Sequence, residues 1–147
     1  MITISRALAQ DVPRLCELEN QVFISSDGII TKRAFLYHVK KDNLLLVCKK
    51  NKKIIGYILF FCPANKAYSR LYSLAVLPQF QGKGYASTLI KKALAKIDER
   101  YKRIFLEVRI SNKGAIKLYE SFGFVKTKVL PKYYSDGEDA LKMCRDI

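Results

Sequence analysis

The feature that most constrains the fold is a glycine-rich segment, Gln81-Gly82-Lys83-Gly84-Tyr85-Ala86, which follows an apolar run over residues 71–77. After it, apolar side chains recur with the period of an amphipathic helix, and lysine, aspartate and glutamate occupy the other face. The apolar positions are Tyr85, Ala86, Leu89, Ile90, Ala93, Leu94 and Ile97. The segment therefore predicts a turn that joins a strand to the start of a helix.

Such a turn suits an anionic ligand. The first N–H groups of a helix lack intrahelical acceptors and carry roughly half a positive charge, which favours a pyrophosphate. Gly82 and Gly84 would let the backbone approach that ligand closely. The spacing matches neither the dinucleotide-binding G-x-G-x-x-G nor the P-loop G-x-x-x-x-G-K-[ST]. An ordinary strand-to-helix turn is the alternative that these six residues leave open.

A second block, residues 106–124, predicts a strand, a helix and the start of another strand. Alternation along the strand places Glu107 on the face opposite Leu106. Asn112 is a candidate N-cap of the helix, and Gly123 stands where a left-handed residue ends it. The inner face of this helix would carry Ala115, Ile116, Leu118, Tyr119 and Phe122.

Together the two blocks resemble the GNAT acetyltransferase superfamily, whose signature at the turn is Q/R-x-x-G-x-G/A. With the later Tyr133-Tyr134-Ser135-Asp136-Gly137, the chain looks like the RimI-like branch, the ribosomal-protein-alanine N-acetyltransferases. The resemblance runs from about Tyr68 to Met143, and before Tyr68 it rests on element order. It implies an α+β (mixed α/β) GNAT fold, β-α-α-β-β-β-α-β-α-β-β, around a mixed sheet that is splayed where cofactor and substrate meet.

The remaining elements follow from local patterns. A short strand at 2–4 precedes a helix opened by Asp11 and Pro13, and Thr31 would cap a second helix after a loop at 25–28. Strands at 44–48 and 54–61 are expected to form an antiparallel hairpin around a turn at 50–53. The last two strands are expected near 124–129 and 140–145.

The resemblance implies a binding site for acetyl-coenzyme A. The backbone of Leu74, Ala75 and Val76 would pair with the pantetheine amides, and Asn112 and Tyr119 would contact the same arm. The pyrophosphate would lie at the turn, against Gln81, Gly82, Lys83, Gly84, Tyr85, Ala86 and Ser87. The alternatives are a buried central strand, a helix cap and a solvated lysine.

The resemblance also implies the catalytic residues. Glu107 would accept the proton of the acceptor amine, directly or through a water, and Tyr119 would protonate the departing thiolate. Transfer from a phenol near pKa 10 to a thiolate near 8.5 is uphill by about 2 kcal/mol, so it needs a lowered tyrosine pKa or a concerted step. The alternatives are an ion pair of Glu107 with Arg109 or a lysine, and a Tyr119 that is only a packed aromatic.

The expected acceptor is the N-terminal α-amine of a protein, a ribosomal protein being one candidate. Freeing a lysine amine at neutral pH costs roughly 3.5 kcal/mol more than freeing an α-amine. Tyr133 and Tyr134 would hydrogen-bond the acceptor backbone, or else pack at a hairpin end, and residues 23–30 would form the opposite wall. The alternatives are acetylation of a lysine or a small amine, and a basic module that binds coenzyme A or RNA without turnover.

Length and charge are consistent with one N-acetyltransferase domain over residues 1–147. With 27 Lys+Arg against 13 Asp+Glu, the net charge of +14 would attract polyanions, although a solvated lysine-rich surface explains it equally. The charge permits nucleic-acid binding without requiring it. The sequence displays no locally acidic pocket, which disfavours polyamine substrates.

Targeting and metal signals are not found in the sequence. No apolar run is long enough to span a membrane and no secretory segment follows Met1, so a cytoplasmic protein is expected. Cys16, Cys48, Cys62 and Cys144 are widely spaced, and His38 is the single histidine, so reduced thiols and no metal site are expected. Oligomeric state and acyl-chain preference leave no readable pattern.

Overall fold

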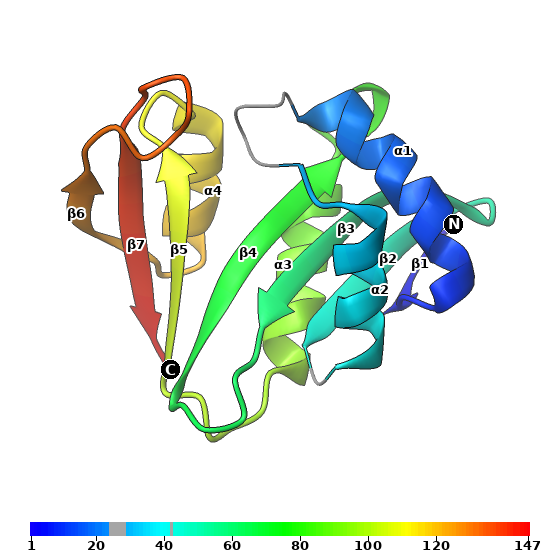
Figure 1. Ribbon diagram of the computed structural model, residues 1–147, viewed down its shortest axis with the longest axis horizontal. Helices are drawn as coiled ribbons and strands as arrows, with labels where there is room; N and C mark the ends of the chain where they lie inside the picture. Colours follow the sequence, from blue (N-terminus) through cyan, green and yellow to red (C-terminus); the bar gives the residue numbers. More distant parts are fainter. Residues whose placement is uncertain (24–28, 42) are drawn as a thin grey trace.

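The computed structural model describes residues 1–23, 29–41 and 43–147, and within them the strands form one seven-stranded sheet in the order β1-β2-β3-β4-β5-β7-β6 (Figure 1). All neighbouring strands are antiparallel except β4 and β5. The strands are β1 (Ile2–Arg6), β2 (Leu44–Lys50), β3 (Lys53–Phe61), β4 (Tyr68–Val76), β5 (Arg103–Arg109), β6 (Val125–Leu130) and β7 (Ala140–Asp146). This order confirms the mixed sheet predicted from the sequence.

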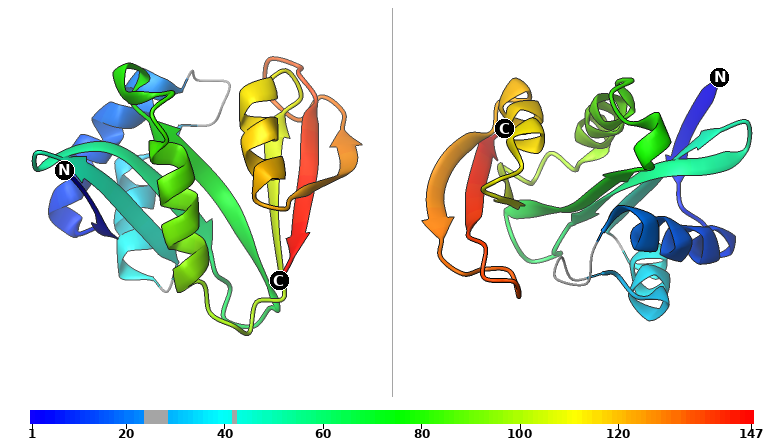
Figure 2. Two further views of the ribbon diagram at one scale, coloured as in Figure 1. Left: turned by 180° about the vertical axis from the view of Figure 1, so that it is seen from behind. Right: turned by 90° about the horizontal axis from the view of Figure 1, so that it is seen from above.

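The helices lie on both faces of the sheet. Helices α1 and α2 cover one face, whereas α3 and α4 cover the other (Figure 2). Their bounds are α1 (Val12–Val22), α2 (Lys32–Lys40), α3 (Tyr85–Lys96) and α4 (Lys113–Ser121), with short 3-10 turns η1 (Ala9–Asp11) and η3 (Pro78–Phe80). The predicted loop at 25–28 lies outside the described residues.

The predicted helix signals are confirmed by position. The hydroxyl of Thr31 accepts a hydrogen bond from the Ala34 N–H at 3.2 Å, so Thr31 caps α2. Gly123, just past α4, has a φ of +88°, as its predicted position requires. Asp11 occupies the N-cap position of α1 and Pro13 lies in its first turn, as predicted, but the Asp11 side chain makes no hydrogen bond to that helix. Its carboxylate instead accepts from the Leu8 N–H at 2.8 Å and closes the turn before the helix.

The predicted hairpin of β2 and β3 is confirmed, and both strands are buried on both faces. Residues 44–48 and 54–60, apart from Gly56, are buried apolar side chains, which explains their continuous apolar runs. Strand β2 extends to Lys50, two residues beyond the prediction. At the tip, Asn51 and Lys52 both adopt positive φ, the backbone that a tight hairpin turn needs.

The sheet splits between β4 and β5. Their parallel pairing covers only Tyr68↔Arg103, Ser69↔Ile104 and Arg70↔Phe105. Just beyond, β4 carries a bulge: Leu71 pairs with Phe60 and Ser73 with Leu59, so Tyr72 is an extra residue. A bulge bends its strand and increases the local twist. Figure 1 shows the result, with β4 and β5 diverging from their paired ends.

A substitution at Gly56 of β3 would test how tightly β3 packs against the part of β4 that has separated from β5. A Cβ atom at Gly56 would lie 2.8 Å from the Ala75 carbonyl oxygen and 3.3 Å from Val76 Cγ2. We expect Gly56→Ala to lower the free energy of unfolding by about 1–3 kcal/mol, because backbone must shift to admit the methyl group. Urea unfolding of both proteins would measure the difference.

Gly114 of α4 provides the matched control. A Cβ there would meet nothing within 4 Å, and alanine is the better helix former. Gly114→Ala should leave the stability unchanged or raise it by about 0.5–1 kcal/mol. Equal stabilities for the wild type and Gly56→Ala would show that β4 yields easily at this point.

Candidate active site

A cleft of about 1090 Å³ opens where β4 and β5 separate. It is lined by the C-terminal end of α1, by β4, by the turn before α3, by β5 with the start of α4, and by the 131–139 loop between β6 and β7. Of the site residues predicted from the sequence, Lys83 alone is not among the described lining residues. The fold therefore brings residues that were predicted from separate segments together in one cleft.

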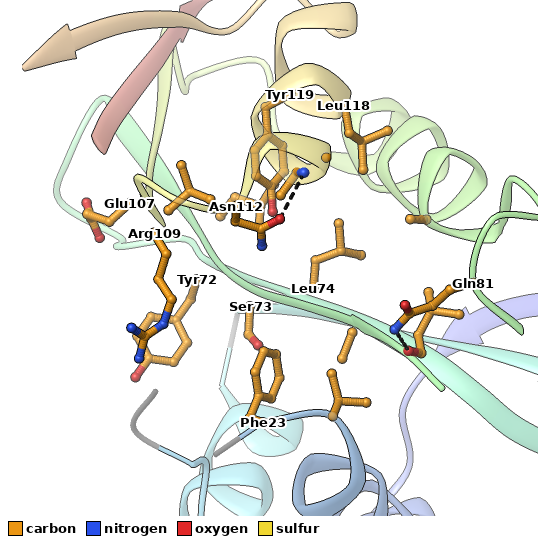
Figure 3. A pocket seen from close by; sticks show the side chains of 18 of the residues that line it. Phe23, Tyr72, Ser73, Leu74, Gln81, Glu107, Arg109, Asn112, Leu118 and Tyr119 are labelled. Atoms are coloured by element: carbon orange, nitrogen blue, oxygen red, sulfur yellow. Dashed lines mark hydrogen bonds between the residues drawn. The ribbon is translucent and has the colours of Figure 1, made fainter. Parts of the chain in front are cut away.

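The cleft has two sides, separated by β4 (Figure 3). Leu74 points to the side of α3 and α4, where Leu118 and Tyr119 approach it. Tyr72 and Ser73 project to the side of α1, where Phe23 lies. Consecutive residues share that side because the bulge interrupts the alternation of the strand.

The glycine-rich turn has the backbone that was predicted for it. Gly82 and Gly84 have φ values of +76° and +85°, which side chains other than glycine adopt only with strain. A Cβ at either position would meet nothing within 4 Å, so the backbone angle, not crowding, requires glycine here. The side chain of Gln81 donates to the Val76 carbonyl at 2.8 Å and ties the turn to the end of β4 (Figure 3).

Helix α3 presents its amino-terminal end to the cleft. Its first helical hydrogen bond runs from the Thr88 N–H to the Gly84 carbonyl at 3.1 Å. The N–H groups of Tyr85, Ala86 and Ser87 precede that bond, so helix geometry gives them no intrahelical acceptor. Because these three residues line the cleft, they give it a set of N–H donors and the positive end of a helix dipole.

Asn112 and Tyr119 enter the cleft from α4. The side-chain oxygen of Asn112 accepts from the Ala115 N–H at 3.2 Å, which confirms its role as N-cap. Tyr119 is buried and packs edge-on against Phe124, with ring centroids 6.0 Å apart. Burial, with a smaller contribution from Tyr134, raises the pKa of the Tyr119 hydroxyl well above its ordinary value. A lowered pKa, one of the two conditions for proton transfer, is thus not met.

Glu107 is held by an arginine that the sequence did not single out. Nη2 of Arg70 donates to Oε1 of the Glu107 carboxylate and, at 3.2 Å, to the Tyr133 hydroxyl. The Tyr133 hydroxyl is itself 3.5 Å from the same Glu107 oxygen. The predicted alternative of an ion pair with Arg109 is therefore wrong in its partner, because β4 rather than β5 supplies the cation.

Arg109 instead anchors the loop that carries the two tyrosines. Its Nη1 donates to Asp136 at 2.9 Å and to Glu138 at 2.8 Å, and its guanidinium lies 4.2 Å from the centroid of the Tyr134 ring. The pKa of Asp136 is lowered, first by a hydrogen bond from the backbone of Glu138 and then by Arg109. Tyr133 and Tyr134 thus stand on a loop fastened to β5.

The family described as the acetyltransferase (GNAT) family matches residues 12–124. The chain belongs to the GNAT acetyltransferase family. It is 36% identical over 126 residues to an N-alpha-acetyltransferase of Saccharolobus solfataricus. The match spans 77% of this chain and 75% of that relative.

Solved structures agree with that assignment. The ribosomal-protein-S18-alanine N-acetyltransferase from Escherichia coli superposes with a TM-score of 0.88 at 28% identity, over 100% of this chain and 94% of that one. Ard1 from Thermoplasma volcanium gives a TM-score of 0.85 at 27% identity, over 99% and 97% of the two chains. The predicted GNAT fold and the likeness to the RimI-like branch are confirmed.

This GNAT enzyme also contains a buried polar network beside the cleft that sequence reasoning missed. Glu19 of α1 is 1% exposed, and it accepts hydrogen bonds from the Tyr57 hydroxyl and, at 2.8 Å, from the Ile30 N–H. The Tyr57 hydroxyl lies 2.7 Å from Ser73 Oγ on β4. Burial and the charge of Glu19 raise the pKa of Tyr57. A signal was present, since Glu19 falls four residues after Leu15 on the apolar face of α1.

The charge of the cleft differs from that of the whole chain. Its described lining contains four carboxylates, those of Glu19, Glu107, Asp136 and Glu138, against the two arginines. The sequence displays no locally acidic pocket because these residues are far apart along the chain: the fold brings them together from α1, β5 and the 131–139 loop. Each carboxylate has a hydrogen-bonding partner within the protein.

No cysteine or histidine lines the cleft of the GNAT enzyme within its described residues. All four cysteines are free, and burial raises the thiol pKa of Cys16, Cys48 and Cys62. His38 stacks on Phe61 with ring centroids 5.0 Å apart, away from the cleft. Among the residues that the structure describes, no group of three metal-ligating side chains lies close together, and no helix is long and apolar enough to cross a membrane.

Proposed function

We propose that this GNAT enzyme transfers the acetyl group of acetyl-coenzyme A to the N-terminal α-amine of a protein. The observation that carries the proposal is the cleft, whose lining includes both the N–H groups at the start of α3 and the side chains of Glu107, Tyr119 and Tyr133. The names of two relatives support the acceptor: one is an N-alpha-acetyltransferase and the other acetylates an alanine of ribosomal protein S18.

The residues present fit acetyl-coenzyme A. The N–H groups at the start of α3 would hold the pyrophosphate, and Gly82 and Gly84 let the backbone reach it. Leu74, Ala75 and Val76 lie on β4 beyond its last pair with β5, so their backbone can pair with the pantetheine amides as another strand would. Bound acetyl-coenzyme A supplies the acetyl thioester.

Tyr119 would serve as the donor toward the leaving sulfur. Because its pKa is raised, the phenol keeps its proton throughout the physiological range and can transfer it only as the carbon–sulfur bond breaks. Its position supports this role, since it is buried beside Leu118 on the coenzyme side of β4. The structure therefore favours the concerted alternative over a tyrosine that ionises beforehand.

Glu107, on β5, would accept the proton of the acceptor amine, directly or through a water. An α-amine at pH 7 needs about 1 kcal/mol to lose its proton, which demands little of the protein. A main-chain N–H of β4 would steady the developing oxyanion. Attack is direct, because no cysteine or histidine of the described lining could carry the acetyl group.

A peptide panel tests the acceptor. Peptides with a free N-terminus and no lysine should be acetylated, whereas N-terminally blocked peptides that contain lysine should react at least about a hundredfold more slowly, in line with the roughly 3.5 kcal/mol difference in deprotonation. Thiol release and mass spectrometry of each product would be measured. Acetylation confined to blocked lysine peptides would reject the α-amine proposal in favour of a lysine acetyltransferase.

The glycine turn is tested with Gly84→Ala. At a φ of +85° the new Cβ strains the backbone by about 1–2 kcal/mol and displaces the N–H donors, so we expect a loss of at least about tenfold in acetyl-coenzyme A affinity by calorimetry. Gly123→Ala is the control, because its φ of +88° brings the same strain outside the cleft. It should lower the melting temperature alone. Equal affinities in both variants would remove the turn from the coenzyme site.

Tyr119→Phe tests the proton donor. We expect kcat to fall by about 10²-fold or more while the KM for acetyl-coenzyme A changes by less than about threefold, because a donor needed only in the transition state is lost. Tyr101→Phe is the matched control: its hydroxyl is also buried and donates to the Pro63 carbonyl at 2.7 Å, but it lies outside the cleft. An undiminished kcat for Tyr119→Phe would leave Tyr119 as a packing residue.

A further inference from the structure

Arg70 stands at the point where the sheet divides. It forms the last residue pair of β4 with β5, opposite Phe105, and the strands separate beyond it. Glu107 lies two residues further along β5, on the same face as Phe105. The guanidinium of Arg70 crosses the widening gap and contacts both Glu107 and the Tyr133 hydroxyl. One side chain thus connects β4, β5 and the 131–139 loop.

The guanidinium is held in place by aromatic rings as well. Its central carbon lies 5.1 Å from the centroid of the Tyr72 ring and 5.8 Å from that of Phe105. Tyr72 is the bulged residue of β4, so the bend that opens the cleft also brings this ring against Arg70. A planar cation favours such ring faces, and they restrict the directions in which its N–H groups can point.

One hydrogen-bond donor of the Arg70 side chain is unpaired in the described part of the chain. Its Nε atom is buried and has no hydrogen-bond partner within the described residues. A buried, unsatisfied N–H costs stability, so a side chain retained only to join two strands would not be expected to carry one. Arg109, the other arginine of the cleft, is engaged by Asp136, Glu138 and the ring of Tyr134 and cannot substitute for Arg70 at Glu107.

We propose that Arg70 is a positioning residue of the acetyl transfer, which holds the Glu107 carboxylate and the Tyr133 hydroxyl in one cluster and so fixes where the acceptor amine meets the thioester. This inference rests on the proposed function. Arg70 acts through its two partners and does not itself exchange a proton with the acceptor.

The cluster of Arg70, Glu107 and Tyr133 should affect the acceptor peptide but not the coenzyme. Glu107, Tyr133 and Arg70 face the acceptor, whereas the diphosphate site at the start of α3 lies at the other end of β4. Losing Arg70 frees the Glu107 side chain to rotate away, which slows the chemical step, and it releases the Tyr133 hydroxyl that would contact the acceptor peptide. Binding of the coenzyme does not depend on either effect.

The test begins with the kinetics of Arg70→Gln and Arg70→Lys on a free N-terminal peptide. For Arg70→Gln we expect kcat to fall at least about tenfold and the peptide KM to rise, with the acetyl-coenzyme A KM within about twofold of the wild type. Arg70→Lys restores the charge but cannot make the same set of contacts, so it should recover part of kcat. Arg103→Gln, whose side chain pairs with Asp146 at 2.8 Å outside the cleft, should behave as wild type.

A double-mutant cycle then separates positioning from scaffolding. If Arg70 acts through Glu107, the effect of Arg70→Gln on kcat should shrink to less than about threefold in a Glu107→Gln background, with partial coupling in Tyr133→Phe. An undiminished effect in both backgrounds, an unchanged kcat, or a parallel rise in both KM values would overturn the proposal.

Folding and function are checked separately. The melting temperature and the thermal protection by acetyl-coenzyme A are measured for every variant, and the protection should match that of the wild type. Should Arg70→Gln not fold, Arg70→Lys carries the same cycle, because it too must lose kcat through Glu107. A wild-type enzyme inactive on every free N-terminal peptide would refute the proposed function instead, and the cycle would then be run on the amine it does acetylate.

Discussion

The short parallel pairing of β4 with β5 is the constraint on which the site depends. Three residue pairs join the strands, and the bulge at Tyr72 then turns β4 away. Backbone groups beyond Arg70 on that edge are left without a neighbouring strand, a cost that a folded domain normally avoids. The cost would be offset if an amide-bearing ligand took the place of the missing strand, which is the role that the proposed function gives to this gap in the ladder.

The same split decides where the charges of the cleft lie. The chain carries +14 overall, yet the described cleft lining holds more carboxylates than arginines. Arg70 offsets Glu107, and Arg109 offsets Asp136 and Glu138, so ion pairs line the part of the cleft at β5 and the 131–139 loop, while the start of α3 offers backbone N–H groups. In the proposed function, a polyanionic coenzyme and a cationic peptide terminus would thus meet different electrostatic surfaces of one cleft.

Local signals predicted the fold well. The turn at 81–86, the caps at Thr31 and Asn112 and the left-handed Gly123 are each set by short-range backbone chemistry, which a sequence displays directly. The pairing of Arg70 with Glu107 and of Tyr57 with Glu19 joins residues 37 and 38 positions apart. Such contacts depend on the register of the sheet and on the bulge at Tyr72, and the periodicity of the sequence predicts neither. The pairing of Arg70 and the network of Glu19 were therefore found only in the structure.

The protonation states of the cleft point to the acceptor as the group that changes near neutral pH. Burial raises the pKa of the Tyr119 and Tyr57 hydroxyls, so both remain donors, and no histidine or cysteine lines the described part of the cleft. The side chains that titrate most readily between pH 6 and 9 are therefore missing from these walls. An α-amine near pKa 7.7–8.0 supplies such a group itself, whereas a lysine near 10.4 stays almost fully protonated throughout that range. In the proposed reaction, the group that titrates near neutral pH is thus the substrate amine, and the part of the protein would be to accept its proton at Glu107 and to orient the freed amine.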